Sequence, residues 1–307
     1  MVVAEPVRAH GFPAHVGVVW RPDFRPGALA GFAGAAEQAG VDELWLWEDC
    51  FLQGGIAQAA VALAETRSLV VGIGVLPAPL RGVVATALEI STLATMFPGR
   101  VQLAIGHGVQ RWMRQAGTAA PSPLTLLREY VTALRGLLSG DTVSMSGDYV
   151  ELDAVRLQFV PDVSVPVLIG GAGPKTLALA GGIADGVLLD CQHTASTVGT
   201  ALDLVDRAWR HTETPDFRRV MYIACAPGPF AAERLAVEAH RWNVTPAREF
   251  GIGGSVGDIS AAVEPYCAAG VDTVVLQPIG KETDTPDVLT TAAALIRTWR
   301  HPTFPPV

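Results

Sequence analysis

The sequence predicts an α/β fold, a (β/α)8 barrel with insertions after its fourth and seventh strands. Half of the 307 residues are apolar, which is enough for a large core. Short apolar runs alternate with longer Ala- and Leu-rich runs, and eight short runs are each followed by a helical one. An open, doubly wound sheet is the competing architecture. No linker rich in Ser, Pro and Gly divides the chain, so one domain over residues 1–307 is expected.

The expected strands are short and almost continuously apolar, as are parallel strands covered on both faces. They are His15–Trp20, Glu43–Trp47, Leu69–Leu76, Val101–Ile105, Val165–Ile169, Asp185–Leu189, Arg219–Ala224 and Asp272–Gln277.

The expected helices begin and end on residues typical of helix ends. Ser122, for example, is expected to cap the helix that starts at Pro123, and Gly140 follows the end of that helix. The helices are Pro26–Ala39, Ile56–Glu65, Val83–Phe97, Pro123–Ser139, Pro174–Ala180, Ala195–Arg210, Phe230–His240, Ile259–Ala269 and Pro286–Arg300. Two excursions interrupt the alternation, Asp141–Asp162, which reads as a hairpin or loop, and Arg241–Gly257 with Trp242 and Pro246.

Composition and charge argue against several classes of function. The net charge is −8 and no basic stripe is visible, so nucleic acid is not an expected partner. The cysteines are far apart and form no C-x-x-C pair, which argues against a zinc site and a disulfide framework; they are Cys50, Cys191, Cys225 and Cys267. No metal is expected in the site. Met1–Pro13 lacks the apolar run of a signal peptide, and no run is long enough to span a bilayer. A cytoplasmic protein without a membrane partner is expected.

The turn after the fifth strand is the most informative segment. It consists of Gly170, Gly171, Ala172, Gly173, Pro174 and Lys175. A glycine-rich turn that leads into a helix presents free backbone N–H groups and the positive end of the helix dipole, and both bind phosphate. The spacing is neither that of a Walker A loop nor G-x-G-x-x-G, and an ordinary βα turn is the alternative.

Three other strand ends carry candidate side chains, because a barrel places its reactive groups at the C-terminal ends of its strands. Gly106 and Gly108 flank His107, an arrangement suited to a flat ring against the backbone, with His107 as a hydrogen-bond or proton donor. Glu48 and Asp49 follow the second strand as candidate acid–base groups, with Asp49 expected nearest the barrel axis. A loop hydrogen bond for the histidine and a solvated, helix-capping loop for the carboxyl pair are the alternatives. Aromatic walls for a substrate pocket are expected from Trp20, Trp47 and Trp112.

Five segments, in this order, resemble the luciferase-like family of oxidoreductases. The resemblance is strongest to the branch that depends on coenzyme F420 and is typified by methylenetetrahydromethanopterin reductase. The segments are Ala39–Asp49, Gly72–Pro77, Pro98–Gly108, Gly170–Lys175 with Ala184–Gly186, and Ala269–Pro278.

The resemblance implies a TIM barrel, usually a homodimer, that performs two-electron transfer at C5 of the deazaflavin. It also implies a bulge or non-prolyl cis bond in the third strand near Gly74 and Val75, with the cofactor ring over Gly74, Val75 and Leu76. The cofactor phosphate would then meet Gly171–Pro174, in agreement with the glycine turn. FMN is the alternative cofactor, in a monooxygenase that uses O2.

Two departures from the family bear on the reaction. Members often carry Asp-His after the second strand, where this chain has Glu48 and Asp49. In the sugar-phosphate dehydrogenase branch that histidine and a glutamate after the fourth strand are catalytic, and the second position here is Val109. Sugar-phosphate oxidation is therefore disfavoured. The expected reaction is hydride transfer to a C=C or C=N bond of a small organic substrate; a flavin carrier without turnover is the alternative from a different class.

Overall fold

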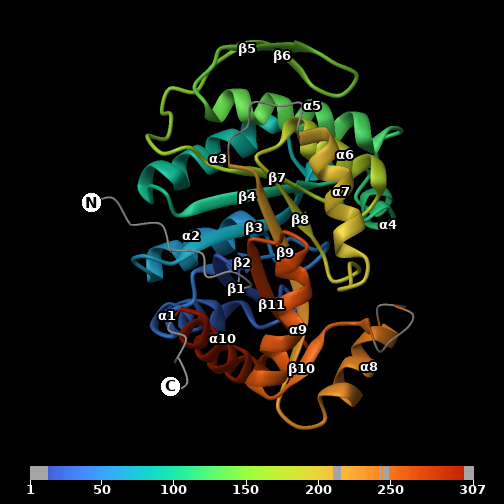
Figure 1. Ribbon diagram of the computed structural model, residues 1–307. Helices are drawn as coiled ribbons and strands as arrows, with labels where there is room; N and C mark the ends of the chain where they lie inside the picture. The colour runs from blue at the N-terminus through green and yellow to red at the C-terminus, as the bar shows by residue number, and fades with distance from the viewer. Residues whose placement is uncertain (1–12, 210–215, 242–243, 245–248, 301–307) are drawn as a thin grey trace.

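The computed structural model describes residues 13–209, 216–241, 244 and 249–300. Within these residues eight parallel strands close into a barrel, in the ring order β1, β2, β3, β4, β7, β8, β9, β11 (Figure 1). They are β1 His15–Trp20, β2 Glu43–Leu46, β3 Val70–Pro77, β4 Val101–Gly106, β7 Val167–Gly170, β8 Gly186–Leu189, β9 Arg218–Pro227 and β11 Thr273–Pro278. The predicted fold class is confirmed, and each expected strand is found within three residues of its predicted ends.

Helices cover the outer face of the barrel (Figure 1). They are α1 Leu29–Gln38, α2 Gly55–Glu65, α3 Val83–Met96, α4 Gln110–Gln115, α5 Pro123–Leu138, α6 Pro174–Ile183, α7 Val198–Trp209, α8 Ala231–Arg241, α9 Val256–Ala268 and α10 Thr285–Arg300. The short helix α4 was not predicted. Ser122 precedes α5 as expected, but its hydroxyl bonds the Thr125 hydroxyl at 2.7 Å instead of a backbone N–H, so the capping prediction is wrong.

The first excursion is an antiparallel hairpin of β5 Val143–Ser146 and β6 Glu151–Val155, which lies beyond α5 at the top of Figure 1. The Glu129 carboxylate of α5 holds the turn of this hairpin by accepting the N–H groups of Asp148, Tyr149 and Val150 at 2.8–3.0 Å.

In the second excursion, residues 242–243 and 245–248, including Trp242 and Pro246, lie outside the described residues. Its described part contains β10 Ile252–Gly254, which pairs with the last residues of β9.

Two apolar layers build most of the core, and a third, small cluster around Phe250 lies beside β9. The larger one fills the space between strands and helices. The smaller one fills the barrel interior with Val19, Trp45, Ala104, Leu168, Leu188, Val220, Tyr222 and Val275. Successive side chains of a strand point to opposite faces, so Val19 enters the interior whereas Val18 and Trp20 enter the outer layer.

A polar network fills the N-terminal end of the barrel. The Arg218 guanidinium donates to Glu43 at 2.6 Å, to Thr273 at 2.8 Å and to the Gln102 side chain. Burial raises the pKa of Glu43, but the adjacent Arg218 outweighs it and the net shift is downward. The ion pair therefore occupies one end of the barrel and leaves the other end for a ligand.

Three further observations concern the described part of the chain. No helix there has both the length and the apolar character needed to cross a membrane. All four cysteines are free thiols. No three His, Cys, Asp or Glu side chains of these residues gather as metal ligands would.

Candidate active site

A cavity of about 430 Å³ opens at the C-terminal ends of the strands. This is the end at which barrel enzymes carry their sites. Predicted site residues that line it are Trp47, Glu48, Asp49, Gly74, Val75, Gly106, His107, Gly108, Trp112, Gly170 and Gly171.

The floor of the cavity is an irregular stretch of β3. The Gly74–Val75 peptide bond is cis, and the pairing with β4 shifts register between Gly74 and Leu76, as the family resemblance implied. The Tyr222 hydroxyl of β9 donates to the Gly74 carbonyl at 3.1 Å. Leu76 does not line the cavity: it points into the outer core and is 1% exposed, so its predicted contact with a cofactor is corrected.

Asp49, the third residue after β2, reaches the cavity with its carboxyl group unengaged: among the described residues no hydrogen bond or ion pair to this carboxyl is found. Burial, with a smaller contribution from the Asp23 carboxylate, raises the pKa of Asp49 from 3.8 to about 6, and Arg21 opposes the shift. A carboxyl group with this pKa exchanges its proton close to neutral pH and is protonated below about pH 6, which suits general acid catalysis.

Glu48, the neighbouring carboxylate, is engaged on both oxygens. Arg81 donates to them at 2.6 and 2.9 Å, and the backbone N–H of Gly55 donates to one of them at 2.8 Å. Glu48 thus ties the end of β2 to the start of α2 and to the segment after β3. Its surroundings favour a positioning role over the predicted acid–base role.

His107, after β4, lies between the first turns of α5 and α6. Its Nδ1 donates to the Pro123 carbonyl at 3.2 Å, because a carbonyl can only accept. Burial lowers the pKa of His107, so the ring is uncharged near neutrality and Nε2 accepts the Thr176 hydroxyl at 2.9 Å. Both ring nitrogens form hydrogen bonds within the chain, which favours a role for His107 in anchoring α6 over its predicted role as a proton donor.

The glycine turn ends at the N-terminus of α6, whose cap residue is Gly173. Ala172, Gly173, Pro174 and Lys175 lie at the rim, outside the cavity lining. No side chain caps this helix, and in the described chain the N–H groups of Ala172, Gly173 and Lys175 have no hydrogen-bond partner. A Cβ atom built on Gly173 would meet no atom within 4 Å. Open space, free donors and the helix dipole together fit a phosphate group beside the cavity.

Aromatic rings wall the cavity from several elements. Trp47 stacks on Tyr222, with ring centroids 6.2 Å apart and planes at 20°, and Trp112 of α4 adds a third ring. Trp20 is not part of this wall. It is 1% exposed and packs on Phe24 and Phe32 with centroids 5.1 and 5.0 Å away, so its assignment to a substrate pocket is corrected.

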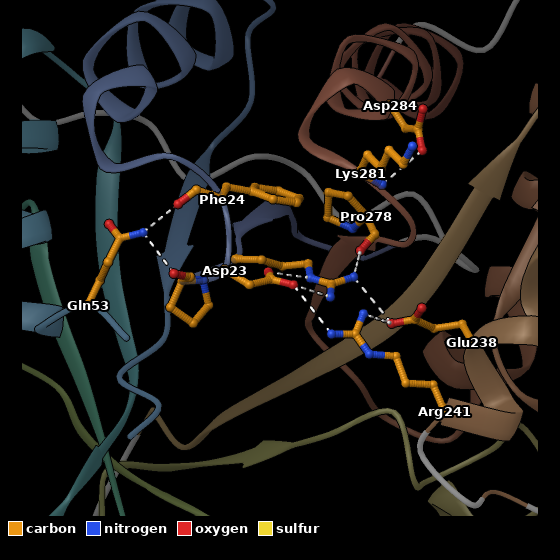
Figure 2. A network of polar contacts seen from close by, with 10 residues as sticks. Asp23, Phe24, Gln53, Glu238, Arg241, Pro278, Lys281 and Asp284 are labelled. Atoms are coloured by element: carbon orange, nitrogen blue, oxygen red, sulfur yellow. Dashed lines mark hydrogen bonds and ion pairs between the residues drawn. The ribbon is translucent and has the colours of Figure 1, made fainter. Parts of the chain in front are cut away.

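An ion network around the buried Arg21 and Glu238 joins the mouth of the barrel to α8 (Figure 2). Arg21, directly after β1, is 2% exposed and donates to Asp23 at 2.8 and 3.0 Å, to Glu238 at 3.2 Å and to the Pro278 carbonyl at 3.3 Å. Arg241 lies 3.6 Å from the Asp23 carboxylate and 3.8 Å from that of Glu238. The network fixes the start of the second excursion, whose residues Val244 and Phe250 line the cavity.

The family model for luciferase-like monooxygenases matches residues 8–261 of the chain. The chain belongs to this family. The resemblance inferred from the five sequence segments is thereby confirmed.

The named relatives of this luciferase-like chain include F420-dependent enzymes. It is 28% identical over 255 residues to 5,10-methylenetetrahydromethanopterin reductase of Methanolobus tindarius, an alignment that covers 76% of the chain and 77% of that protein. It is 33% identical over 223 residues to F420-dependent glucose-6-phosphate dehydrogenase of Nakamurella multipartita, covering 66% and 64%.

A solved structure supports the fold of the luciferase-like chain. The coenzyme F420 dependent tetrahydromethanopterin reductase of Methanopyrus kandleri superposes with a TM-score of 0.80 at 19% identity, over 93% of this chain and 99% of that one.

Several lining residues of this luciferase-like protein were missed by sequence reasoning. Tyr222 and Gln277 are polar side chains within apolar strands, a signal that could have found them. Asp190, at the end of β8, directly follows an apolar run, just as Glu48 does. Phe250 carries no such signal, because it lies in an irregular segment far along the chain.

Proposed function

We propose that this luciferase-like protein is an oxidoreductase that binds coenzyme F420 and transfers hydride between the reduced deazaflavin and a small organic substrate. The observation that carries the proposal is the uncapped N-terminus of α6 at the rim of a cavity floored by the Gly74–Val75 bulge. The names of the relatives, which include F420-dependent dehydrogenases, support the choice of cofactor.

The residues that would hold F420 lie on three strand ends. Val75 offers an apolar floor between Gly106 and Gly170, and the free N–H groups of Ala172, Gly173 and Lys175 would bind the phosphate. His107 keeps this turn in place through Thr176. When bound, F420 supplies two electrons and a proton as hydride at C5 of its ring.

Asp49 supplies the proton in the proposed reaction. Reduction of a C=C or C=N bond needs one proton besides the hydride, and a buried carboxyl group with a pKa of about 6 can deliver it near neutral pH. After transfer the carboxylate faces the open cavity and takes a proton from water. The ion pair between Arg81 and Glu48 fixes the residue that precedes Asp49, and thereby the direction of the Asp49 side chain.

An FMN-dependent monooxygenase is the second candidate. FMN is also a flat ring with a phosphate, and the matching family model is described by monooxygenase activity. The cavity would accept either ring, so the cofactor must be tested directly.

A homodimer is also proposed. Large apolar side chains are exposed on neighbouring helices, with Val61 of α2 and Leu88 and Met96 of α3 between 46% and 65% exposed. Contiguous exposed apolar surface marks a contact with another protein, and these two helices are the face that we propose for the dimer. Light scattering after gel filtration should give twice the chain mass of 32.2 kDa, and a monomer would reject this assembly.

The proposed cofactor is tested by titrating the purified protein with F420 and, separately, with FMN, using calorimetry. Saturable F420 binding, together with oxidation of reduced F420 when an imine or enone is added, is the expected result. Saturable FMN binding with no F420 binding would reject the proposal in favour of the monooxygenase.

A further inference from the structure

Two carboxylates face the cavity from opposite sides of the barrel. Asp49 follows β2 and Asp190 follows β8, and both line the cavity. These strands are four positions apart in either direction around the eight-strand ring. A molecule on the barrel axis therefore lies between the two carboxyl groups.

Neither charge is balanced by a basic side chain of the lining. The described lining residues include no Arg and no Lys. Asp190 accepts the backbone N–H and the side-chain amide of Gln192, which are neutral donors. His107 is uncharged, and burial also lowers the pKa of His193 beside Asp190 although Asp190 opposes this. The third acidic group, Glu48, is neutralised by Arg81.

The rest of the lining is rich in aromatic rings. Trp47, Trp112, Tyr222 and Phe250 come from four different elements or loops. Aromatic faces attract organic cations, and the attraction increases where water is excluded. Carboxylates and aromatic faces are thus both complementary to positive charge.

We propose that the substrate of this site is an organic cation, an iminium ion or protonated imine, held between Asp49 and Asp190 and the aromatic walls. This inference rests on the proposed function and narrows its substrate to the C=N class. An anionic substrate such as a sugar phosphate would face two carboxylates with no basic lining residue in the described chain to receive it, and the nearby Arg21 is already engaged by Asp23 and Glu238.

The reaction balances with groups already named. A neutral imine takes the proton of the Asp49 carboxyl group at its nitrogen and becomes the iminium ion, which then lies between the Asp49 and Asp190 carboxylates, whereas a substrate that is already an iminium ion needs no proton. The carbon of that ion then gains the hydride that the proposed function assigns to the reduced cofactor, so the C=N π bond breaks and a C–H bond forms. The products are an amine, the oxidised cofactor and the Asp49 carboxylate, which water re-protonates.

The proposal is tested by binding, which does not require turnover. The protein is saturated with oxidised F420 and titrated by calorimetry at about pH 8, where Asp49 is ionised because its pKa is about 6. The probes are the cation N-methylquinolinium, neutral quinoline and the anion quinoline-2-carboxylate, which share one ring system. We expect the cation to bind about tenfold more tightly than the neutral probe, and the anion more weakly than both.

Asp190→Asn should remove most of the preference for the cation and leave quinoline affinity unchanged. The matched control is Asp203→Asn, which makes the same charge change on an exposed residue of α7 outside the cavity and should keep the preference. A cation that binds no better than quinoline, or an Asp190→Asn variant that keeps the preference, would overturn the substrate class. F420 affinity is measured first in the same samples, so a failure of the proposed cofactor is recognised separately.

Discussion

Asp49 and Glu48 are neighbours in the chain, yet their carboxyl groups have opposite surroundings. Arg81 and the Gly55 N–H engage both oxygens of Glu48. Asp49 faces the cavity in a desolvated position that raises its pKa to about 6. Both residues lie in the loop after β2, where different partners surround them, which separates a positioning carboxylate from one that can exchange a proton.

Asp49→Asn should lower the rate of reduction by about a hundredfold or more, since general acids typically contribute that much. In the wild-type protein the rate should fall as the pH rises through about 6, where the acid is lost, and the variant should lack this transition. The pH profile of kcat/KM checks this. An unchanged profile in the variant would remove Asp49 from the reaction.

The same substitution should change stability with a definite sign. The folded pKa of about 6 lies above the ordinary value of 3.8, so ionisation disfavours the folded state and stability falls as the pH rises between these values. Asp49→Asn does not ionise. Its Tm should therefore equal that of the wild type near about pH 4 and exceed it above about pH 7. A Tm difference independent of pH would contradict the assigned burial effect.

At the residue scale the sequence identified the right strand ends but not every side-chain direction. Trp20 ends β1 just as Trp47 follows β2, yet only Trp47 reaches the cavity. A strand buried on both faces shows no alternation of apolar and polar residues, so the inward face cannot be read from its composition. Leu76 was misassigned for a related reason, because the register shift in β3 changes which residues face inward.

At the scale of elements, the N-terminus of α6 is the proposed phosphate site. Gly173→Asp should fold normally, because Gly173 has φ −75° and a Cβ there meets no atom within 4 Å. Asp is a favourable N-cap, so Tm should not fall, but its charge would repel the phosphate and F420 affinity should drop at least about tenfold. Gly173→Asn caps without the charge and is the matched control. Equal F420 affinity in both variants, measured by calorimetry, would exclude the turn from the site.

The loop after β1 should control the acid that follows β2. Asp23 raises the pKa of Asp49 and Arg21 lowers it, so Asp23→Asn should move the titration of Asp49 downward and Arg21→Gln should move it upward. The carboxyl ¹³C shift, assigned by its absence in Asp49→Asn, reports the midpoint. Shifts of the same sign in both variants would show that the network acts through structure instead of charge.

Helices and strands were predicted from their apolar runs and end residues, and the nine expected helices are found. The helix α4 was missed because its six residues, Gln110–Gln115, are too few for a periodic pattern. The network of Arg21, Asp23 and Glu238 could not be predicted either, since Arg21 and Glu238 are 217 residues apart in the chain.

On the scale of the whole molecule, the N-terminal end of the barrel stabilises the fold and the C-terminal end holds the cavity. Arg218→Ala should leave the Glu43 carboxylate, 3% exposed, without its cation and lower the free energy of unfolding by about 3–5 kcal/mol. Arg218→Lys keeps a charge and should lose less. Urea unfolding measures the effect, and F420 affinity of the folded variant should stay unchanged because the pair lies at the opposite end from the cavity. Lost affinity with unchanged stability would contradict this division.

The closed barrel was predicted from eight repeats, whereas the path of the second excursion was not. Phe250 lines the cavity because β10 pairs with the last residues of β9. No local sequence pattern predicts this pairing. Irregular segments are placed by such distant contacts, so sequence periodicity carries little information about them.

The bulge in β3 also predicts which positions of related sequences should vary together. It turns Val75 toward the ends of β4 and β7, where a Cβ atom on Gly170 would come within 2.3 Å of the valine side chain and one on Gly106 within 3.0 Å. The three positions therefore share one volume. Across an alignment of the family, larger residues at positions 106 or 170 should occur together with Gly, Ala or Ser at position 75. Such covariation would trace the floor of the cavity through enzymes whose substrates differ.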